Sequence, residues 1–444
     1  MPTPAIGAST TGRSVGRMPI RTLLAAATLA AVLGPAGPSA AAASGTIGSI
    51  NLAPAARPAG PAPADRIAAI RRRHAGEVLA RVLITDPRQL DRLDAAGCDQ
   101  WTHGHQAGWH EFRLDQAQLE LVRRMGLRHE VVREDVAELL AAEAARLAAA
   151  GDGAAVGGAD FFADYRPLDV VASFTDTLAA THPELASVVD LGQSLEGRPI
   201  RGLRITGPGD ATDRPAVLIN ALQHAREWIT VPTVLWFAQS MLEGYGQDPE
   251  ITAILDAIEL HVIPVTNPDG YVWSWDENRL WRKNRRDNGD GSFGVDLNRN
   301  WSFQWGGQGA SENPSSAIYR GTGPFSEPES TVLSQYILDL GDVAAHLDVH
   351  SYGQLILSPF GYDFVEPEGI TGRTHLVLGR TFADYIAEVS GAIYDPGPAW
   401  GLYLASGTCS DWAHGGAGAI SFTFELRPAN ANEGGFVLPP EAIE

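Results

Sequence analysis

The chain has 444 residues, of which 44% are hydrophobic and 19% charged, and its formal net charge is −20. This length suggests more than one structural unit, and the apolar share suits a globular protein rather than a disordered one. The acidic balance argues against nucleic acid as a partner, because phosphate binding needs a basic surface. It favours solubility but identifies no substrate.

The N-terminal segment, residues 1–44, is predicted to be a secretion signal. An arginine-containing stretch ending at Arg21 precedes an apolar run from Leu23 to Leu33, and small residues follow. This is the order of an export signal. The run is shorter than the roughly 20 residues that a membrane span needs, and no later segment is apolar enough for a span. We therefore expect a secreted, extracellular protein without a membrane partner.

Composition divides the next part of the chain. Residues 45–64, rich in alanine, proline and glycine, are predicted to be a flexible linker. Residues 65–147 are expected to form a small unit, and the small-residue stretch 148–158 is predicted to be a linker that a protease can enter. Within the small unit the patterns predict a strand over 78–85 and helices over 116–125 and 131–147.

From residue 159 to the end, helical and strand patterns alternate. The predicted helices cover 168–182, 231–243, 329–340 and 375–389, and the predicted strands cover 216–221, 260–265, 344–350 and 419–426. Strands interleaved with helices indicate an α/β fold with a layered sheet.

A histidine and a glutamate, His224 and Glu227, follow the strand predicted over 216–221. Imidazole and carboxylate are ordinary zinc ligands, and this spacing lets both reach one ion. The spacing alone is weak evidence. The same pattern occurs at His74 and Glu77, where we interpret it as a solvated helix face.

A catalytic zinc usually has three protein ligands and one open position. His350 is an attractive third ligand, because it ends a predicted strand and a loop follows it. Strand ends are where α/β sheets place their sites. His346 and Asp348 lie on the same face of that strand and are rivals for this role. Alternatively, both residues surround the metal ligands without binding the metal, or lie in the core with their hydrogen bonds satisfied.

A basic segment, residues 279–286, stands out in this acidic chain. It is either a solvated loop or a focused positive patch that binds a carboxylate or polarises a carbonyl. Arg299 lies between Asn298 and Asn300, which makes a suitable cradle for a terminal carboxylate.

Glu425 lies on a predicted strand between Phe424 and Leu426. Apolar surroundings raise the pKa of a carboxyl group, so Glu425 is a candidate base. The alternative is a buried glutamate paired with Arg427.

Taken in order, these segments resemble zinc metallocarboxypeptidases of the pancreatic carboxypeptidase A/B type, over about residues 160–440. The shared motifs are SLEGRPI (194–200), HAREWIT (224–230), TNPDGY (266–271), NRLWRK (278–283), GVDLNRNW (294–301), HSYGQ (350–354), LASG (404–407) with DW (411–412), and FTFELR (422–427). The resemblance implies a mixed, mostly parallel twisted sheet flanked by helices. It also implies one Zn²⁺ per chain and hydrolysis of the C-terminal peptide bond of peptides and proteins.

The resemblance implies a role for each matching residue. The zinc ligands are expected to be His224, Glu227 and His350. Asp296 matches the acid that orients His224, a normal arrangement around a metal-bound imidazole.

Two further matches concern the reaction itself. Glu425 matches the general base that activates the zinc-bound water, and Arg282 matches the arginine that polarises the scissile carbonyl.

The resemblance also implies contacts to the substrate. Asn298 and Arg299 match the clamp on the free C-terminal carboxylate, and Tyr403 matches the mobile tyrosine that closes over the substrate. Arg226 and Tyr352 match residues that contact the peptide on the other side of the cleaved bond.

Three positions nearby are less clear-cut. Phe436 matches an apolar residue near the site. Ser410 stands where an acid favours basic C-terminal residues and a bulky apolar residue favours apolar ones. Serine is neither, and we expect neutral or apolar side chains to be preferred. Cys409 beside it is either an inert small hydrophobe or a reactive thiol.

Residues 65–147 are similar to the pro-segment of the same family. The similarity implies a small α/β domain that caps the active-site cleft and is released by an activating protease that cuts within 148–158. The expected partners are therefore peptide or protein C-termini and this protease, and we expect a monomer. The chain has two cysteines. Such a cut would separate Cys98 from Cys409, so a bond between them would not hold one mature domain together.

The chain departs from the family in two further places. The usual disulfide of the loop after the arginine-rich segment is missing, since Phe293 and residues 314–316 stand near its positions. The chain also stops at Glu444, where the family's last helix should begin, so we expect that helix to be missing.

Two other functions remain as alternatives. One is a non-catalytic peptide-binding protein on the same fold, against which the intact ligands, base and clamp argue. The other is a peptidase acting on bacterial wall peptides, against which the Asn298–Arg299 clamp and the pro-segment argue.

Overall fold

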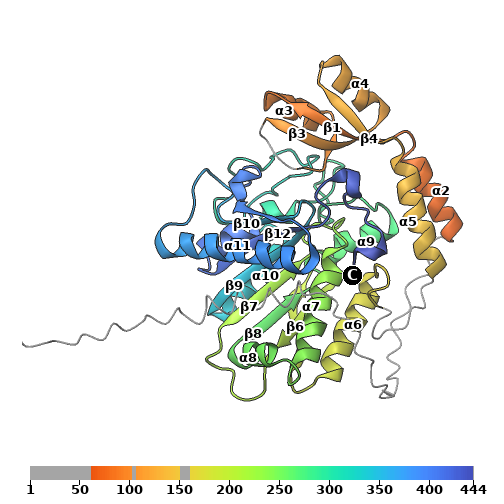
Figure 1. Cartoon of the computed structure of the whole chain (residues 1–444). Helices are drawn as coiled ribbons and strands as arrows, with labels where there is room; N and C mark the ends of the chain where they lie inside the picture. Colours follow the sequence, from red (N-terminus) through yellow and green to blue (C-terminus); the bar gives the residue numbers. More distant parts are fainter. Residues whose placement is uncertain (1–61, 103–106, 151–160, 444) are drawn as a thin grey trace, which may run out of the picture.

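The computed structural model of the chain describes residues 62–102, 107–150 and 161–443. The described residues form two sheets (Figure 1): a four-stranded one in the order β2-β3-β1-β4 and an eight-stranded one in the order β11-β10-β12-β9-β7-β8-β6-β5. The predicted secretion signal and most of both predicted linkers lie outside these residues. Among the helices that are described, none is both long and apolar enough to cross a membrane.

The smaller sheet is antiparallel and lies in the N-terminal part. Its strands are β1 (Val78–Ile84), β2 (Asp99–Gln100), β3 (Gly108–Leu114) and β4 (His129–Arg133). Helices α3 (Arg88–Ala95) and α4 (Gln116–Arg124) share an apolar core with the sheet. Helices α2 (Pro63–Arg73) and α5 (Val136–Ala150) pack against each other beside it (Figure 1).

The boundaries predicted for this part need correction. Residues 131–147 are not one helix, because Val131 and Val132 belong to β4, in which Val131 pairs with Ala80 of β1 and Arg133 pairs with Leu79. Adjacent β-branched residues fit a strand better than a helix. Helix α5 begins at Val136 and runs to Ala150, into the predicted linker, and α2 begins at Pro63, inside the other predicted linker.

The interpretation of His74 and Glu77 as a solvated helix face is wrong. His74 follows the end of α2 and is only 2% exposed. Its Nδ1 lies 2.8 Å from Glu77 Oε2, which also accepts a hydrogen bond from Arg113 Nη1 at 2.9 Å. The pattern therefore marks a polar cluster inside the N-terminal part.

The larger sheet is mixed. At its centre β7 (Ala216–Ala221) runs parallel to β8 (Glu259–Ile263) and β9 (Val343–Ser351), and β12 (Ile420–Leu426) runs parallel to β9. The other strands are β5 (Ala186–Gln193), β6 (Pro199–Ile205), β10 (Leu355–Ser358) and β11 (Asp395–Pro398). Antiparallel pairing joins β5 to β6, β6 to β8 and β10 to β12. The predicted mixed, mostly parallel sheet is confirmed.

Helices cover both faces of this sheet (Figure 1). They are α6 (Leu168–Thr181), α7 (Thr230–Gly244), α8 (Pro249–Ala257), α9 (Pro268–Asp276), α10 (Pro328–Leu340), α11 (Gly369–Ser390) and α12 (Cys409–Gly415). Alternate residues of β7 enter different cores, because side chains of a strand alternate between the two faces. Val217 and Ile219 belong to an apolar cluster with residues of α6, α7 and α11, whereas Ala216 and Leu218 belong to one with residues of α10 and α12.

The parallel strands place their carboxyl ends at one edge of the sheet. The chain leaving β7 there carries His224 and Glu227, and β9 carries His350 near its own end. On the neighbouring strand β12, Glu425 pairs in register with His350. Segments far apart in sequence therefore meet at the edge where α/β sheets place their sites.

Candidate active site

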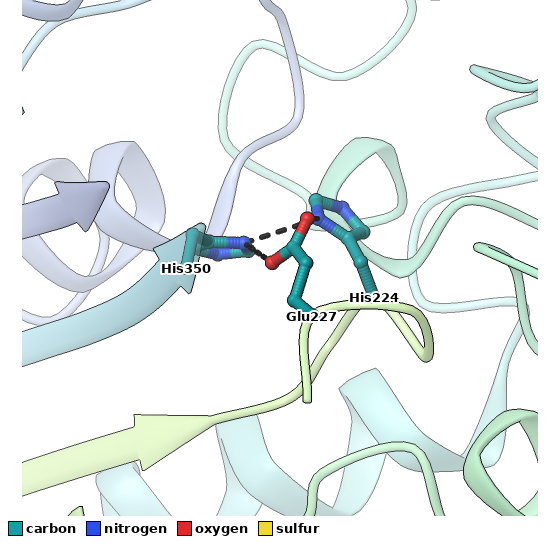
Figure 2. A group of neighbouring side chains, drawn as sticks. All are labelled: His224, Glu227 and His350. Carbon is teal, nitrogen blue, oxygen red and sulfur yellow. Dashed lines mark hydrogen bonds and ion pairs between the residues drawn. The ribbon is translucent and has the colours of Figure 1, made fainter. Parts of the chain in front are cut away.

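The side chains of His224, Glu227 and His350 converge at this edge (Figure 2). Their ligand atoms all lie within 4.8 Å of one another. His350 Nδ1 is 3.0 Å from Glu227 Oε2 and 3.1 Å from His224 Nδ1, and His224 Nδ1 is 2.8 Å from Glu227 Oε1. Two imidazole nitrogens and one carboxylate aimed at a common point are a donor set that fits a catalytic zinc.

In each histidine the Nε2 atom, which points away from the other two ligands, contacts a buried carboxylate. His224 Nε2 is 3.2 Å from Asp296 Oδ1, and His350 Nε2 is 2.9 Å from Asp348 Oδ2. These contacts place the ring protons on the Nε2 atoms and leave both Nδ1 atoms available for a metal.

Asp296 is held in its ionised form. Burial opposes ionisation, but Arg282, Arg299 and His224 outweigh it and keep the pKa of Asp296 well below its usual value. Its Oδ2 accepts a hydrogen bond from Arg282 Nη2 at 2.9 Å.

His346 and Asp348 are not part of the metal-facing group. His346 contacts Ser421 Oγ at 2.9 Å and Asn220 Oδ1 at 2.7 Å. His346 and Asp348 are both fully buried. Of the possibilities left open by the strand pattern, His350 faces the other ligands, and its two rivals form a polar shell behind it.

A cavity of about 310 Å³ opens beside the three converging side chains. Most residues implied by the family resemblance line it, namely His224, Glu227, Arg282, Asn298, Arg299, Tyr352, Tyr403, Ser410, Glu425 and Phe436. Arg226, Asp296 and His350 lie behind this lining, and all three are buried.

Glu425 is half-buried at the cavity wall. Burial raises the pKa of its carboxyl group to about 8, and the Glu227 carboxylate adds to this rise, whereas His350 and Arg282 oppose it. Arg427 hydrogen-bonds Tyr394. This placement favours a role in the cavity over the alternative of a buried Glu425–Arg427 pair.

Arg299 presents an unused donor. Its Nε donates to Gly309 O at 2.7 Å and its Nη1 donates to Asn298 O at 2.7 Å. In the described part of the chain its buried Nη2 has no hydrogen-bond acceptor. Buried polar groups are normally satisfied, so this cationic N–H suits an anion entering the cavity.

Asn298 is held beside this arginine. Its Oδ1 accepts a hydrogen bond from the Cys409 backbone N–H at 2.8 Å, which fixes the amide. Cys409 itself is fully buried, and burial raises the pKa of its thiol well above the usual value. A buried thiol with a raised pKa is unreactive, so the inert small hydrophobe is the favoured interpretation.

Hydroxyl groups line part of the cavity. Ser410, Thr408 and Thr423 all lie there, and Thr423 Oγ1 donates to Ser410 Oγ at 3.0 Å. Leu357 and Leu402 also line the cavity.

The N-terminal part reaches into the same site with two acids. Asp99 Oδ1 accepts a hydrogen bond from Arg226 Nη1 at 3.0 Å. Glu111 accepts one from Tyr352 Oη at 2.6 Å and another from the Ala431 N–H at 3.1 Å. The two residues that the resemblance places along the substrate peptide are thus already bonded to the N-terminal part.

Aromatic packing accompanies these polar contacts. Trp101 and Thr102 line the cavity. The Trp101 ring packs edge-on against Phe436 and Tyr352, with ring centroids 5.0 Å and 6.4 Å apart. The N-terminal part therefore contributes to the wall of the cavity next to Phe436 and Tyr352.

Helix α5 adds a further buried link. Arg279 Nε donates to Glu143 Oε2 at 2.7 Å, while its other nitrogens donate to Arg226 O at 2.8 Å and Phe436 O at 2.6 Å. Its guanidinium also stacks on Trp228, with the guanidinium carbon 3.7 Å from the ring centroid. Glu143, Asp99 and Glu111 were not identified from the sequence, since no spacing pattern relates them to residues more than a hundred positions away.

The loop without the family's disulfide is held by noncovalent contacts. Lys283 Nζ donates to Pro314 O at 2.8 Å and to Ser316 O at 2.9 Å. Arg285 stacks on Trp273 and Trp281, with its guanidinium carbon 3.7 Å and 4.6 Å from the ring centroids.

Comparison with known proteins adds independent evidence. Residues 171–444 match the family described as zinc carboxypeptidase. The chain is 35% identical over 382 residues to carboxypeptidase A1 of Sus scrofa, covering 83% of this chain and 90% of that protein. It is 40% identical over 289 residues to carboxypeptidase A2 of Rattus norvegicus, covering 65% and 68%.

Solved structures agree with this similarity. Carboxypeptidase A from Helicoverpa armigera matches with a TM-score of 0.72 at 28% identity, over 83% of this chain and 93% of that one. Thrombin activatable fibrinolysis inhibitor matches with a TM-score of 0.70 at 27% identity, over 83% and 94%. The shared fold therefore extends from the large sheet into the N-terminal part.

Proposed function

Because the chain belongs to the zinc carboxypeptidase family, and is therefore a zinc metallocarboxypeptidase that takes one Zn²⁺, we propose that it is a secreted carboxypeptidase made as an inactive proenzyme. It removes single residues from the free C-termini of peptides and proteins, with a preference for neutral or apolar side chains. The observation that carries this proposal is the convergence of His224, Glu227 and His350 beside a cavity that also holds Glu425 and Arg299.

Glu425 is the general base of the proposed reaction. Zinc, when bound, supplies a Lewis acid and lowers the pKa of water. Glu425 takes the proton from the attacking water and later gives it to the leaving amine. Burial raises the pKa of Glu425 to about 8. A cation bound nearby lowers this pKa towards the range that suits a base at neutral pH.

Arg282 stabilises the negative charge that develops on the scissile carbonyl oxygen. Its Nε and Nη2 are bonded to Asp296, while its Nη1 faces the metal site, 3.2 Å from His224 Nδ1. A donor fixed in this way needs little reorganisation during the reaction, which is what makes such stabilisation effective.

Asn298 and Arg299 make the enzyme an exopeptidase. The unused Nη2 of Arg299 is satisfied by a chain-terminal carboxylate but not by an internal peptide bond, which leaves the buried charge unpaired. Tyr403, whose ring centroid is 5.9 Å from the Arg299 guanidinium carbon, closes over the bound terminus.

The proposed substrate preference depends on the part of the cavity near Ser410. Thr408, Ser410 and Thr423 line the cavity with hydroxyl groups, and leucine side chains belong to the same lining. None of these side chains offers a full charge to pair with a basic or acidic C-terminal residue. A neutral or apolar side chain enters such a pocket without leaving a charge unpaired.

The proenzyme proposal depends on the residues that the N-terminal part occupies. Arg226 and Tyr352 contact substrate in the proposed mechanism, and both are bonded to acids of the pro-segment, Asp99 and Glu111. A peptide must therefore displace the cap before it binds. Secretion is proposed from the signal-like residues 1–44.

The proposal is tested with two forms of the protein, uncut and cut within residues 148–158, on one peptide with a free or an amidated C-terminus. We expect the cut, zinc-loaded form to release the terminal residue of the free peptide only, and the chelator-treated form to release none. Zinc binding without turnover would instead support a peptide-binding protein. Strong competition by bacterial wall peptides would support a wall peptidase.

A further inference from the structure

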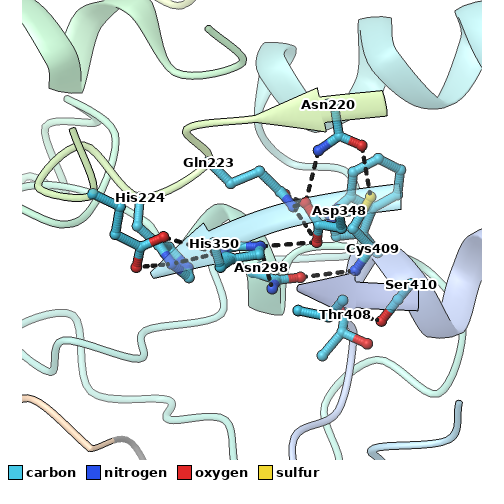
Figure 3. Close-up of polar contacts among 12 residues, drawn as sticks. Asn220, Gln223, His224, Asn298, Asp348, His350, Thr408, Cys409 and Ser410 are labelled. Atoms are coloured by element: carbon cyan, nitrogen blue, oxygen red, sulfur yellow. Dashed lines mark hydrogen bonds and ion pairs between the residues drawn. The ribbon is translucent and has the colours of Figure 1, made fainter. Parts of the chain in front are cut away.

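A buried polar cluster extends from the metal site into the large sheet (Figure 3). Asn220 on β7, Gln223 just after it, and His346 and Asp348 on β9 belong to it, and all four are 0% exposed. A buried carboxylate without partners costs several kcal/mol. The contacts of Asp348 must therefore compensate its charge.

Both carboxylate oxygens of Asp348 are fully used. Oδ1 accepts hydrogen bonds from Asn220 Nδ2 at 2.7 Å and Gln223 Nε2 at 2.8 Å. Oδ2 accepts from Gln223 Nε2 at 2.8 Å and lies 2.9 Å from His350 Nε2. The donors come from β7, the following loop and β9, so the orientation of the carboxylate is fixed from several directions.

The directions of these hydrogen bonds form one consistent series. Ser421 Oγ donates to His346 Nδ1, and His346 Nε2 donates to Asn220 Oδ1. This leaves the Asn220 amide nitrogen to donate to Asp348. In such a network the amide orientation and the tautomers follow from the partners. The remaining hydrogen bond that Asp348 accepts comes from the Nε2–H of His350.

We propose that Asp348 is a positioning residue for the zinc site, which holds the Nδ1 lone pair of His350 towards the metal and ties the two ligand-bearing segments together. Gln223 immediately precedes His224, and its side chain donates to the carboxylate that holds His350. One carboxylate therefore sets the separation of the two histidines. The inference depends on the zinc site described above and adds a second carboxylate to Asp296.

The test measures zinc affinity of the full chain by competition with a chromophoric chelator, which needs no catalytic activity. Asp348→Asn keeps the shape of the side chain but removes one acceptor. We expect it to bind zinc about 10- to 100-fold more weakly than the unmodified chain, the usual effect of losing a partner of a ligating histidine. Glu329→Gln, which changes an equally buried carboxyl group outside this cluster, is the control and should keep the original affinity.

A swapped variant separates positioning from packing. Asn220→Asp combined with Asp348→Asn returns one carboxylate and one amide to the cluster but places the carboxylate on β7. We expect it to recover the thermal stability of the metal-free protein but not the zinc affinity. If the single variant does not fold, this double variant carries the test.

Two results would overturn the inference: unchanged zinc affinity in Asp348→Asn, or recovery of affinity together with stability in the swapped variant. Either would make Asp348 a packing residue only. Absence of zinc from the unmodified chain is a separate result, because it would contradict the zinc site itself.

Discussion

Glu425 and His350 lie opposite each other on the paired strands β12 and β9. The charged side chains around them are paired with one another at short distances. Glu227 lies between two imidazoles, and Asp296 lies between His224 and Arg282. Each of these buried charges is thus matched by a neighbour of opposite sign or by a hydrogen bond, as burial of a charge requires. The roles proposed for single residues can be tested one at a time.

We predict that Glu425→Gln lowers kcat by about 10²- to 10⁴-fold, the usual contribution of a general base, while zinc content stays unchanged. Steady-state kinetics and metal analysis measure the two quantities. Glu388→Gln on the exposed face of α11 is the matched control. Full activity in the Glu425 variant would remove this residue from the mechanism.

We predict that Arg299→Gln lowers kcat/KM for a peptide with a free C-terminus by about 10- to 150-fold, because one charge-assisted hydrogen bond contributes about 1.5–3 kcal/mol. The amidated peptide should be affected much less. Arg380→Gln, an exposed change on α11, is the control. Equal losses on both peptides would argue against a carboxylate clamp.

The sequence alone predicted several of these residues, but not how they are supported. His224 and Glu227 stand out because they are close in sequence and follow a buried strand. The role of Asp348 stayed open, because a strand pattern gives the face of a residue and not its partner. Its donors Asn220 and Gln223 are more than a hundred positions away, and only the folded sheet brings them together.

At the scale of elements, fully buried strands were predicted well and partly exposed strands were missed. Strand β7 is buried throughout and matches its predicted range of 216–221. The partly exposed strands β5 and β6 were not predicted, since they lack a continuous apolar run. The prediction of one helix over 131–147 failed because pairing of Val131 and Arg133 with β1 outweighs helical spacing at the start of this range.

Helix α10 carries a carboxyl group whose state should affect stability. Burial raises the pKa of Glu329 from 4.5 to about 7, although Leu195 N–H donates to it at 3.1 Å and Asn284 Nδ2 at 3.2 Å. The folded protein thus favours the protonated form, while the unfolded chain ionises near the usual value. The contribution of Glu329 to the free energy of unfolding therefore falls as pH rises from about 4.5 to about 7, and it stays constant above that pH.

Glu329→Gln removes this titration. We predict that its free energy of unfolding, relative to the unmodified protein, rises by about 3 kcal/mol between pH about 4.5 and pH about 7. Denaturant unfolding at a series of pH values measures the difference. A difference that does not depend on pH would contradict the buried, protonated state of Glu329.

At the scale of the whole molecule, the N-terminal part and the large-sheet part meet through a shared apolar cluster and several buried polar contacts. Three carboxylates of the N-terminal part accept hydrogen bonds across this contact: Asp99 from Arg226, Glu111 from Tyr352 and Glu143 from Arg279. Two of these contacts, Asp99–Arg226 and Glu143–Arg279, are ion pairs. Removing one partner of a buried ion pair costs about 3–5 kcal/mol, so substitutions at these acids are expected to weaken the attachment of the cap. The family resemblance predicted a cap, but the individual pairs needed the structure.

We predict that Asp99→Asn combined with Glu111→Gln makes the uncut protein several-fold more active, because Arg226 and Tyr352 lose their partners in the cap. The cut enzyme should not change, since the cap no longer contributes. Asp91→Asn, on the exposed face of α3, is the control. Unchanged activity of the uncut variant would contradict an inhibitory role for these contacts.

The central claim is that His224, Glu227 and His350 bind one zinc ion. Zinc-edge X-ray absorption of the cut, zinc-loaded protein tests it directly. We predict one zinc per chain with two imidazole nitrogens at about 2.0–2.1 Å and a carboxylate at about 2.0–2.2 Å. A sample without stoichiometric zinc, or a zinc site with three imidazoles or a sulfur ligand, would contradict the claim.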